Sequence, residues 1–283
     1  MPDALSEQLR VMSFNIRGFW HQDAANAWEH RAELNIATVR RCAPDLIGFQ
    51  EVQGGNLRAY HEALPEYHYF AYPWYDNTPP HAYNAIFWRP KRLRPLEADG
   101  CWLSQTPDRF SGSWGTDNVR VATWLKFACL ASGAMLVHLN THIDHRSAQA
   151  RIEGTRLILA RLDALQADGS PAIVTGDFNE GVGLPVHQLF IGAGFVDAHI
   201  ATGCSDDPSR SFTYHGWEGT AFRGSNDPLR RIDWILLRGG ARGSVHALSC
   251  EIVHDAMPPL YPSDHFPVVA DVEIVAPGVK RSS

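Results

Sequence analysis

The sequence predicts an α/β fold in which two packed sheets lie between layers of helices, a four-layered α/β/β/α sandwich. Two observations lead to this prediction. Short β-rich runs recur along the chain, and several are apolar nearly throughout, as strands covered on both faces should be. Helical segments lie between these runs, as expected for helices that cover a sheet.

The strands are predicted from runs that are rich in β-branched, aromatic and other apolar residues and are bounded by turn residues. They are Leu9 to Ile16, Leu46 to Glu51, Ala85 to Trp88, Val121 to Phe127, Met135 to Asn140, Ala172 to Asp177, Ile232 to Leu237 and Pro267 to Val275.

Two helices are predicted, over residues 28–42 and 147–167. In the second, the residues on one helical face are Ile152, Leu159, Leu162 and Gln166, and Ser147 is available as an N-cap. This pattern is typical of an amphipathic helix that packs on a sheet.

Three segments rich in Pro, Gly, Asn, Asp and aromatic residues are predicted to be long loops: Phe70 to Asn84, Trp102 to Arg120 and Cys204 to Arg231. Loops of this length in a compact domain are usually functional or disordered. Their aromatic residues, Trp74, Trp114, Trp217 and Phe222, argue against disorder and are expected to wall a pocket. The alternative is that they only fasten the loops to the core.

A single domain is predicted for residues 1–283, with its core over about residues 9–275, because no repeat or flexible linker marks a boundary. No stretch reaches the length of apolar sequence that a membrane-spanning helix requires, and the first ten residues have no apolar signal region. A soluble, cytoplasmic protein without membrane insertion is therefore expected. Five widely spaced cysteines form no C-x-x-C pair, so they are interpreted as reduced packing residues.

The formal net charge of -6 argues against a protein that grips long duplexes, because such surfaces are usually basic. A small phosphorylated substrate fits this charge better. Bound divalent cations would, however, invert the local potential at a site lined with carboxylates.

Polar residues stand at the edges of six apolar runs. They are Asn15, Gln50 with Glu51, Asn140 with His142, Asp177 with Asn179, Asp233, and Asp264 with His265. Buried carboxylates are unfavourable unless they are paired or bind a metal, so one convergent metal site explains these residues together. Oxygen ligands of this kind favour Mg²⁺ or Mn²⁺, and the absence of an H-E-x-x-H motif disfavours a protease-type zinc site.

Taken in order, the segments FNIRG, FQE, NTH, GDFN, RIDW and SDH resemble the endonuclease/exonuclease/phosphatase superfamily. The resemblance extends from about Leu9 to about Val275. Within the superfamily, NAWEHR, WLSQTPD, RVATW and NTHIDHR are similar to a bacterial branch of uncharacterised hydrolases. The resemblance implies a DNase I-like sandwich with mainly antiparallel sheets, and hydrolysis of a phosphoester.

The resemblance also implies roles for residues of this chain. Glu51 matches the principal metal ligand, Asn15 a ligand or hydrogen-bond partner beside it, and Asp264 a further metal ligand. Arg17 stands where exonuclease III-like apurinic endonucleases have Asn or Asp, so cleavage at abasic sites is not implied.

Among the catalytic positions, Asp177 matches the carboxylate that orients or deprotonates the attacking water, and Asn179 the amide that donates to the phosphoryl oxygens. His265 matches the histidine beside the scissile phosphate, and Asp233 the carboxylate that orients its ring. His142 resembles a general acid for the leaving alkoxide.

Two further residues are predicted to bind substrate. Asn140 is expected to help hold the phosphate, and Arg120 to act as a phosphate clamp, because a guanidinium matches two phosphoryl oxygens at once. The alternative for Arg120 is a structural ion pair. His145 follows closely enough to face the same cleft, but a solvated surface position explains it equally well.

Three functions remain open from the sequence. The first is a phosphomonoesterase or phosphodiesterase acting on a small substrate, and the second is a nuclease on single-stranded nucleic acid or its ends, with loop aromatics that stack bases. The third is a binding module that has lost catalysis, which the complete set of expected catalytic residues disfavours. The sequence leaves the oligomeric state and the number of metal ions open.

Overall fold

The computed structural model describes residues 6–72, 82–204, 207, 211–223 and 231–276. Within these ranges, the strands form two six-stranded sheets. The first sheet has the order β11 (Ser244–Ile252), β12 (Val268–Val275), β1 (Ser6–Asn15), β2 (Leu46–Val52), β4 (Tyr83–Trp88), β3 (His68–Tyr72). The second has the order β5 (Leu93–Trp102), β6 (Val121–Cys129), β7 (Met135–His142), β8 (Ala172–Asp177), β10 (Asp233–Arg238), β9 (Val196–Asp197).

Each sheet contains one parallel pair of strands, and its other pairs are antiparallel. The parallel pairs are β1 with β2 and β7 with β8. The predicted α/β fold with two mainly antiparallel sheets is thereby confirmed.

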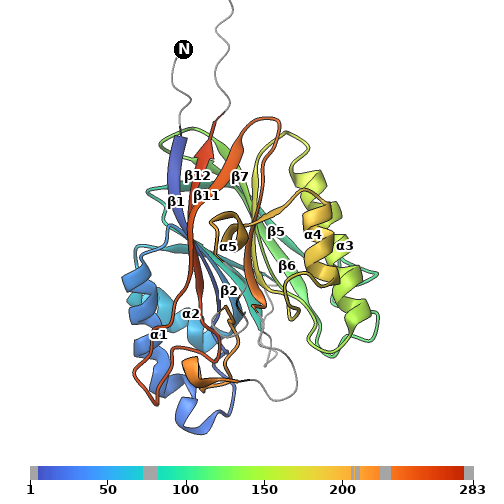
Figure 1. The fold of residues 1–283 in the computed structure, drawn as a ribbon. Helices are drawn as coiled ribbons and strands as arrows, with labels where there is room; N and C mark the ends of the chain where they lie inside the picture. Colours follow the sequence, from blue (N-terminus) through green and yellow to red (C-terminus); the bar gives the residue numbers. More distant parts are fainter. Residues whose placement is uncertain (1–5, 73–81, 205–206, 208–210, 224–230, 277–283) are drawn as a thin grey trace, which may run out of the picture.

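Helices lie on both outer sides of the paired sheets. Figure 1 shows α1 (Trp28–Cys42) and α2 (Gly54–Ala63) on one side, and α3 (Ala148–Leu165) and α4 (Pro185–Gly192) on the other. Three shorter segments complete the helical elements of the described ranges: η1 (Ala24–Asn26), α5 (Ala198–Ala201) and η2 (Gly219–Ala221). The four-layered sandwich follows from this arrangement.

The buried apolar residues form three clusters, one in each space between neighbouring structural layers. Along β1, Leu9 and Val11 point into the cluster between the sheets, whereas Met12 and Phe14 point into the cluster under α1 and α2. A third cluster lies between the second sheet and α3 with α4. A central strand therefore buries both of its faces, which is why its sequence reads as a continuous apolar run.

The predicted helix at residues 28–42 has the same bounds in the structure, and all eight predicted strands are present with small shifts at their ends. Ser147 caps α3, because its side chain accepts a hydrogen bond from the Ala150 amide at 3.1 Å. The predicted buried face of α3 is right at Leu162, but the fully buried positions before it are Thr155 and Ile158 rather than Ile152.

The aromatic residues of the predicted long loops lie in different environments. Trp74 lies outside the described residues. Trp114 is half-buried on its loop, and its backbone carbonyl accepts a hydrogen bond from the Ser147 side chain. Trp217 packs over the guanidinium of Arg31, and Phe222 packs against neighbouring aromatic rings. These contacts agree with the alternative interpretation, in which such residues fasten the loops, for Trp217 and Phe222. None of the helices in the described ranges has the length and apolar character that crossing a membrane would require.

Candidate active site

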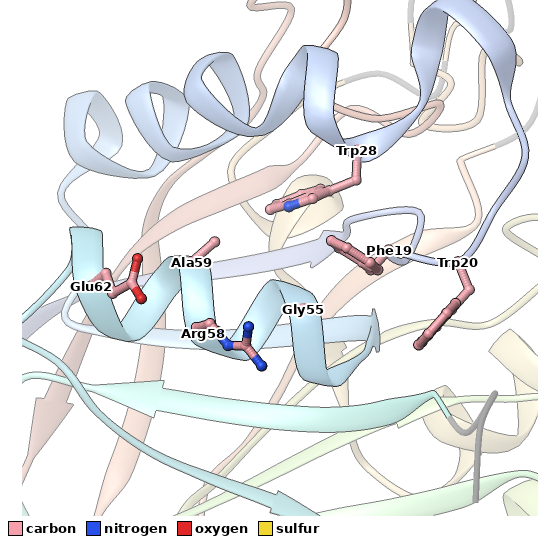
Figure 2. Close-up of a pocket in the computed structure, with 7 residues that line it drawn as sticks. All are labelled: Phe19, Trp20, Trp28, Gly55, Arg58, Ala59 and Glu62. Carbon is pink, nitrogen blue, oxygen red and sulfur yellow. The ribbon is translucent and has the colours of Figure 1, made fainter.

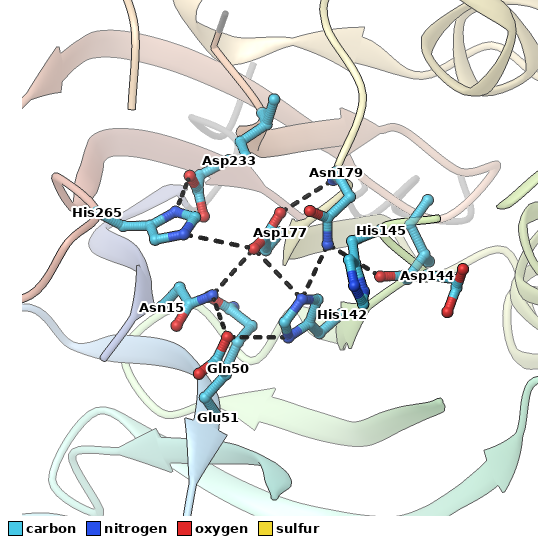
Figure 3. Close-up of polar contacts among 12 residues, drawn as sticks. Asn15, Gln50, Glu51, His142, Asp144, His145, Asp177, Asn179, Asp233 and His265 are labelled. Atoms are coloured by element: carbon cyan, nitrogen blue, oxygen red, sulfur yellow. Dashed lines mark hydrogen bonds and ion pairs between the residues drawn. The ribbon is translucent and has the colours of Figure 1, made fainter. Parts of the chain in front are cut away.

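Strand pairing brings most of the predicted polar residues to one place. In the first sheet, Asn15 at the end of β1 lies opposite Gln50, and Glu51 follows directly. In the second sheet, β8 lies between β7 and β10, so that Asp177 is opposite both His142 and Asp233. Figure 3 shows these side chains converging with His265.

Asp177 is the centre of this cluster. It is buried, and its Oδ2 accepts a hydrogen bond from Asn15 Nδ2 at 2.9 Å. The same oxygen lies 3.3 Å from His142 Nε2 and 3.8 Å from His265 Nε2. Burial and the neighbouring Asp233 carboxylate raise the pKa of Asp177 above its ordinary value. A carboxylate with a raised pKa is suited to accept a proton near neutral pH.

Asp233 and His265 form a buried pair. Their Oδ2 and Nδ1 atoms are 2.9 Å apart. Burial would lower the pKa of His265, but the Asp233 carboxylate outweighs it and raises that pKa to about 10. In the absence of a metal ion, Asp233 thus favours the protonated ring of His265, whose Nε2 faces Asp177 at 3.8 Å.

His142 has the opposite electrostatic environment. Burial and the nearby Arg120 guanidinium lower its pKa well below the ordinary value, so the ring is neutral. Asn179 Nδ2 is 2.9 Å from His142 Nε2 and donates to the Ile143 carbonyl at 3.0 Å. The predicted donation from Asn179 to a phosphate thus competes with its hydrogen bond to the Ile143 carbonyl and its contact with His142. A neutral His142 also makes a weaker general acid than His265.

Glu51 offers a carboxylate oxygen that is not fully engaged. Its Oε1 accepts from Asn15 Nδ2 at 3.1 Å. Its buried Oε2 accepts no hydrogen bond of good geometry within the described chain, although His21 Nε2 lies 3.0 Å away. Burial would raise the pKa of Glu51, but His21 and His142 hold it well below the ordinary value, so the group is ionised.

These buried oxygens fit a divalent cation. Asp233 Oδ1 has no hydrogen-bond partner among the described residues, and the contact of Glu51 Oε2 is with His21 Nε2 at 3.0 Å. One ligand atom from each of Asp177, Asp233 and His265 lies within 4.8 Å of the others. Unpartnered buried carboxylate oxygens are unfavourable without a cation, and oxygen donors of this kind suit Mg²⁺ or Mn²⁺.

Two of the predicted metal ligands need a more exact description. Asn15 donates its amide hydrogens to Glu51 and Asp177, so it has the hydrogen-bonding role, one of the two that were predicted. Asp264 is buried, and its Oδ2 lies 3.7 Å from Arg17 Nε. Burial raises the pKa of Asp264, while His265 and Arg17 oppose this effect.

Arg120 lies at the edge of the site without a carboxylate partner. No ion pair of Arg120 is present among the described residues, and its buried Nε has no hydrogen-bond partner there. Its Nη2 is 3.3 Å from His145 Nδ1. Burial lowers the pKa of Arg120, while Glu51 and Asp177 oppose this effect. The geometry favours a cation available for an anionic ligand over a structural ion pair.

The prediction that Asn140 holds the phosphate does not agree with the structure. Asn140 is completely buried between the sheets. Its Nδ2 donates to the carbonyls of Phe49 and Ala85 at 2.8 and 3.1 Å, and its Oδ1 accepts from Gln50 and Thr175 at 2.7 and 3.1 Å. Every hydrogen-bonding position of the amide is occupied, so Asn140 links the two sheets.

Sequence reasoning missed the role of Arg31, which lies in the NAWEHR segment. Arg31 is completely buried, and it donates to the carbonyls of Ile16, Asn26 and Pro262 at 2.7, 2.8 and 2.8 Å, and to that of Arg17. These acceptors belong to three separate segments around the site. The signal was an arginine within a motif that was used only to identify the branch.

Aromatic residues flank the site from positions that were not predicted. The exposed ring of Tyr214 packs edge-on against His265, with the centroids 5.1 Å apart.

A cavity of about 370 Å³ lies against α2, in the first sheet's half of the molecule (Figure 2). Its lining residues are Phe19, Trp20, Trp28, Gly55, Arg58, Ala59 and Glu62.

Comparisons with known proteins agree with the geometry. Residues 12–265 match the model of the Endonuclease/Exonuclease/phosphatase family. A crystal structure of an endonuclease/exonuclease/phosphatase from Bacteroides vulgatus is 28% identical, with a TM-score of 0.81 over 94% of this chain and 98% of that one. The mannosyl-6-phosphatase Bt3783 of Bacteroides thetaiotaomicron is 27% identical, with a TM-score of 0.82 over 93% and 99%. TDP2 of D. rerio, complexed with a single-strand DNA product, shares the fold at 18% identity and a TM-score of 0.74, over 94% and 99%.

Proposed function

We propose that this chain, which belongs to the endonuclease/exonuclease/phosphatase family, hydrolyses a phosphoester of a small substrate with the help of Mg²⁺ or Mn²⁺. The observation that carries the proposal is the convergence of Glu51, Asp177 and His265. These residues come from three distant parts of the sequence, and their polar atoms meet in one buried cluster with Asn15 and His142.

In this proposal, the metal ion is held by Glu51 and Asp264, with Asn15 fixing the carboxylate of Glu51. When bound, the ion supplies charge stabilisation to the phosphoryl oxygens and lowers the pKa of water. The support for these residues is the incompletely engaged oxygen of Glu51 and the burial of Asp264.

The protein groups around the phosphate then divide into a base and a cation. Asp177, with its raised pKa, orients the attacking water and accepts its proton. His265, kept protonated by Asp233, stabilises the negative charge that develops on the phosphoryl group. Arg120 binds the same group, and Asn179 and His142 position Asp177. As the new bond to the water oxygen forms, the P–O bond to the leaving group breaks, and the leaving oxygen takes up a proton from water or from His265.

A small substrate is favoured over a nucleic acid by two observations. The net charge is -6, whereas proteins that track phosphate chains are usually basic. A relative at 27% identity is a mannosyl-6-phosphatase, so sugar phosphates are the first class of substrate to test.

The test is a panel of sugar phosphates, nucleotides, lipid phosphates and oligonucleotides with Mn²⁺, with and without a chelator. We expect turnover of a small phosphoester that the chelator abolishes. Steep loss of affinity with added salt, together with cleavage of oligonucleotides, would identify a nuclease instead. Absence of metal-dependent turnover on the whole panel would contradict the proposal.

A further inference from the structure

His145 lies between a loop carboxylate and the guanidinium of Arg120. Its Nδ1 is 3.3 Å from Arg120 Nη2, and its Nε2 is 3.5 Å from Asp117 Oδ2. Figure 3 shows His145 with Asp144 on the side of the cluster where His142 lies. Because Arg120 Nη2 can only donate, Nδ1 accepts, and the ring hydrogen is on Nε2, which faces the carboxylate. Each ring nitrogen therefore has a partner, which does not fit a freely solvated surface histidine.

The loop that carries Asp117 is fixed by the buried carboxylate of Asp144. Asp144 Oδ2 accepts from Thr116 Oγ1 at 2.8 Å and from the Asp117 amide at 3.0 Å. Its Oδ1 accepts from the amides of Arg146 and Ser147 at 2.9 and 2.6 Å. Burial would raise the pKa of Asp144, but these hydrogen bonds lower it to about 2. One ionised side chain thus ties the loop before β6 to the segment after β7, so Asp117 has a defined position.

An imidazole partner leaves Arg120 with its full charge. A carboxylate would fix the guanidinium but would also compensate its charge, whereas a neutral ring holds one N–H and leaves the charge intact. The charge reaches the site, because Arg120, after burial, is the group that lowers the pKa of His142 most. The Nε atom of Arg120 has no hydrogen-bond partner among the described residues, so the guanidinium is only partly engaged.

We propose that His145 is a positioning residue, which holds the Arg120 guanidinium in the orientation that binds the phosphoryl group of the substrate. Asp117 keeps the ring of His145 in the required tautomer, and Asp144 keeps Asp117 in place. A guanidinium that is already held in its binding orientation loses less conformational freedom when the anion binds, so His145 raises the affinity for the phosphoryl group. This inference rests on the proposed function, in which Arg120 binds that group.

The experiment measures the affinity of the full-length protein for inorganic phosphate, by isothermal titration calorimetry with Mg²⁺ present. His145→Leu removes the acceptor and is expected to weaken phosphate binding about tenfold, as the loss of one hydrogen bond to a charged group does. His145→Asn has the shape of leucine, but its Oδ1 can replace Nδ1, so its affinity should stay within about threefold of the wild type. The control is His246→Leu, at an exposed histidine whose ring contacts Ser244, and it should bind phosphate as the wild type does.

A double-mutant cycle tests whether His145 acts through Arg120. In the Arg120→Ala background, His145→Leu should change phosphate affinity by less than about twofold, because the group that it positions is absent. A loss in that background as large as in the wild type would overturn the inference. So would equal losses in His145→Leu and His145→Asn, because the acceptor atom would then not matter.

Failure of the inference differs from failure of the proposed function. If Arg120→Ala weakens phosphate binding and His145→Leu does not, the inference is wrong and Arg120 remains the phosphate clamp. A wild type that binds no phosphate would overturn the inference, and only an additional lack of turnover on the whole substrate panel would remove the proposed function. If His145→Leu does not fold, Asp117→Ala frees the other ring nitrogen and should weaken phosphate binding about threefold or more, and an unchanged affinity would count against the inference.

Discussion

Replacing Asn140 tests whether this residue links the sheets or binds substrate. In Asn140→Leu, the carbonyls of Phe49 and Ala85 lose their side-chain donor inside the core. Gln50 Nε2 retains its hydrogen bond to the Gly48 carbonyl at 3.0 Å, and Thr175 Oγ1 retains its hydrogen bond with His138 Nε2 at 2.9 Å. Most of the destabilisation should therefore come from the two carbonyls.

The expected magnitude follows from these contacts. A buried polar group without a partner costs about 1–3 kcal/mol, and a lost hydrogen bond whose donor finds another partner costs about 1 kcal/mol or less. Asn140→Leu should thus lower the free energy of unfolding by roughly 2–8 kcal/mol, a large part of the roughly 5–15 kcal/mol of a typical domain. The nearby Thr141→Val, which removes a single 3.0 Å hydrogen bond to the Val121 carbonyl, is the control and should lose about 1 kcal/mol.

Urea unfolding followed by tryptophan fluorescence measures both variants, and steady-state kinetics on their folded fractions measures KM. The reasoning would be refuted by an Asn140→Leu protein that is as stable as Thr141→Val. It would also be refuted by a stable variant whose KM alone rises, since that result would restore the contact with phosphate.

Further predictions concern catalysis, acid stability and sheet packing. Asp177→Asn should lower kcat about 100-fold or more with an unchanged thermal midpoint. The control is Asp168→Asn, which removes only a surface contact to Lys126 and should leave kcat unchanged. Equal rates in both variants would rule out Asp177 as the base. His138 is buried and neutral, with its pKa lowered by burial to about 3. The unfolded chain protonates His138 below pH 6.5, whereas the folded chain does so only near pH 3, so the contribution of His138 to stability is full above pH 6.5 and falls toward pH 3. At pH 5 the loss is about 2 kcal/mol. His138→Gln should abolish this loss, as measured by urea titrations at pH 5 and 7. Gly48→Ala would place a Cβ 2.0 Å from Thr175 Oγ1, so it should destabilise the protein by about 1–3 kcal/mol or more in the same assay, and a neutral effect would show that the sheets separate easily there.

The strands that sequence patterns failed to predict share one position in the fold. They are β3, β5, β9 and β11, the two edges of each sheet. β5 illustrates the reason: six of its ten residues are exposed, so its sequence lacks the apolar run that marks a strand covered on both faces. Apolar sequence patterns detect burial, and edge strands are the least buried strands of a sheet.

Along β7, two residues with the same predicted environment have different roles. Asn140 and His142 are two positions apart, so both side chains point to the same face of the strand. His142 stands at the strand end beside Asp177, whereas Asn140 lies further inside, where β2 and β4 close over it. Alternation fixes the face of a side chain, but depth between the sheets depends on the other sheet.

The sequence by itself determined the four-layered fold, the central strands and the chemical groups of the site, because carboxylates that interrupt apolar strands are unfavourable unless they are paired or gathered around a cation. Only the tertiary structure decided which groups shift one another's pKa values, which face the site and which hold the sheets together. Asp233 raises the pKa of His265, and Asn140 finds its acceptors on two strands of the opposite sheet. Such partners are distant in sequence, and electrostatic and hydrogen-bonding environments exist only once packing has brought them within a few ångströms.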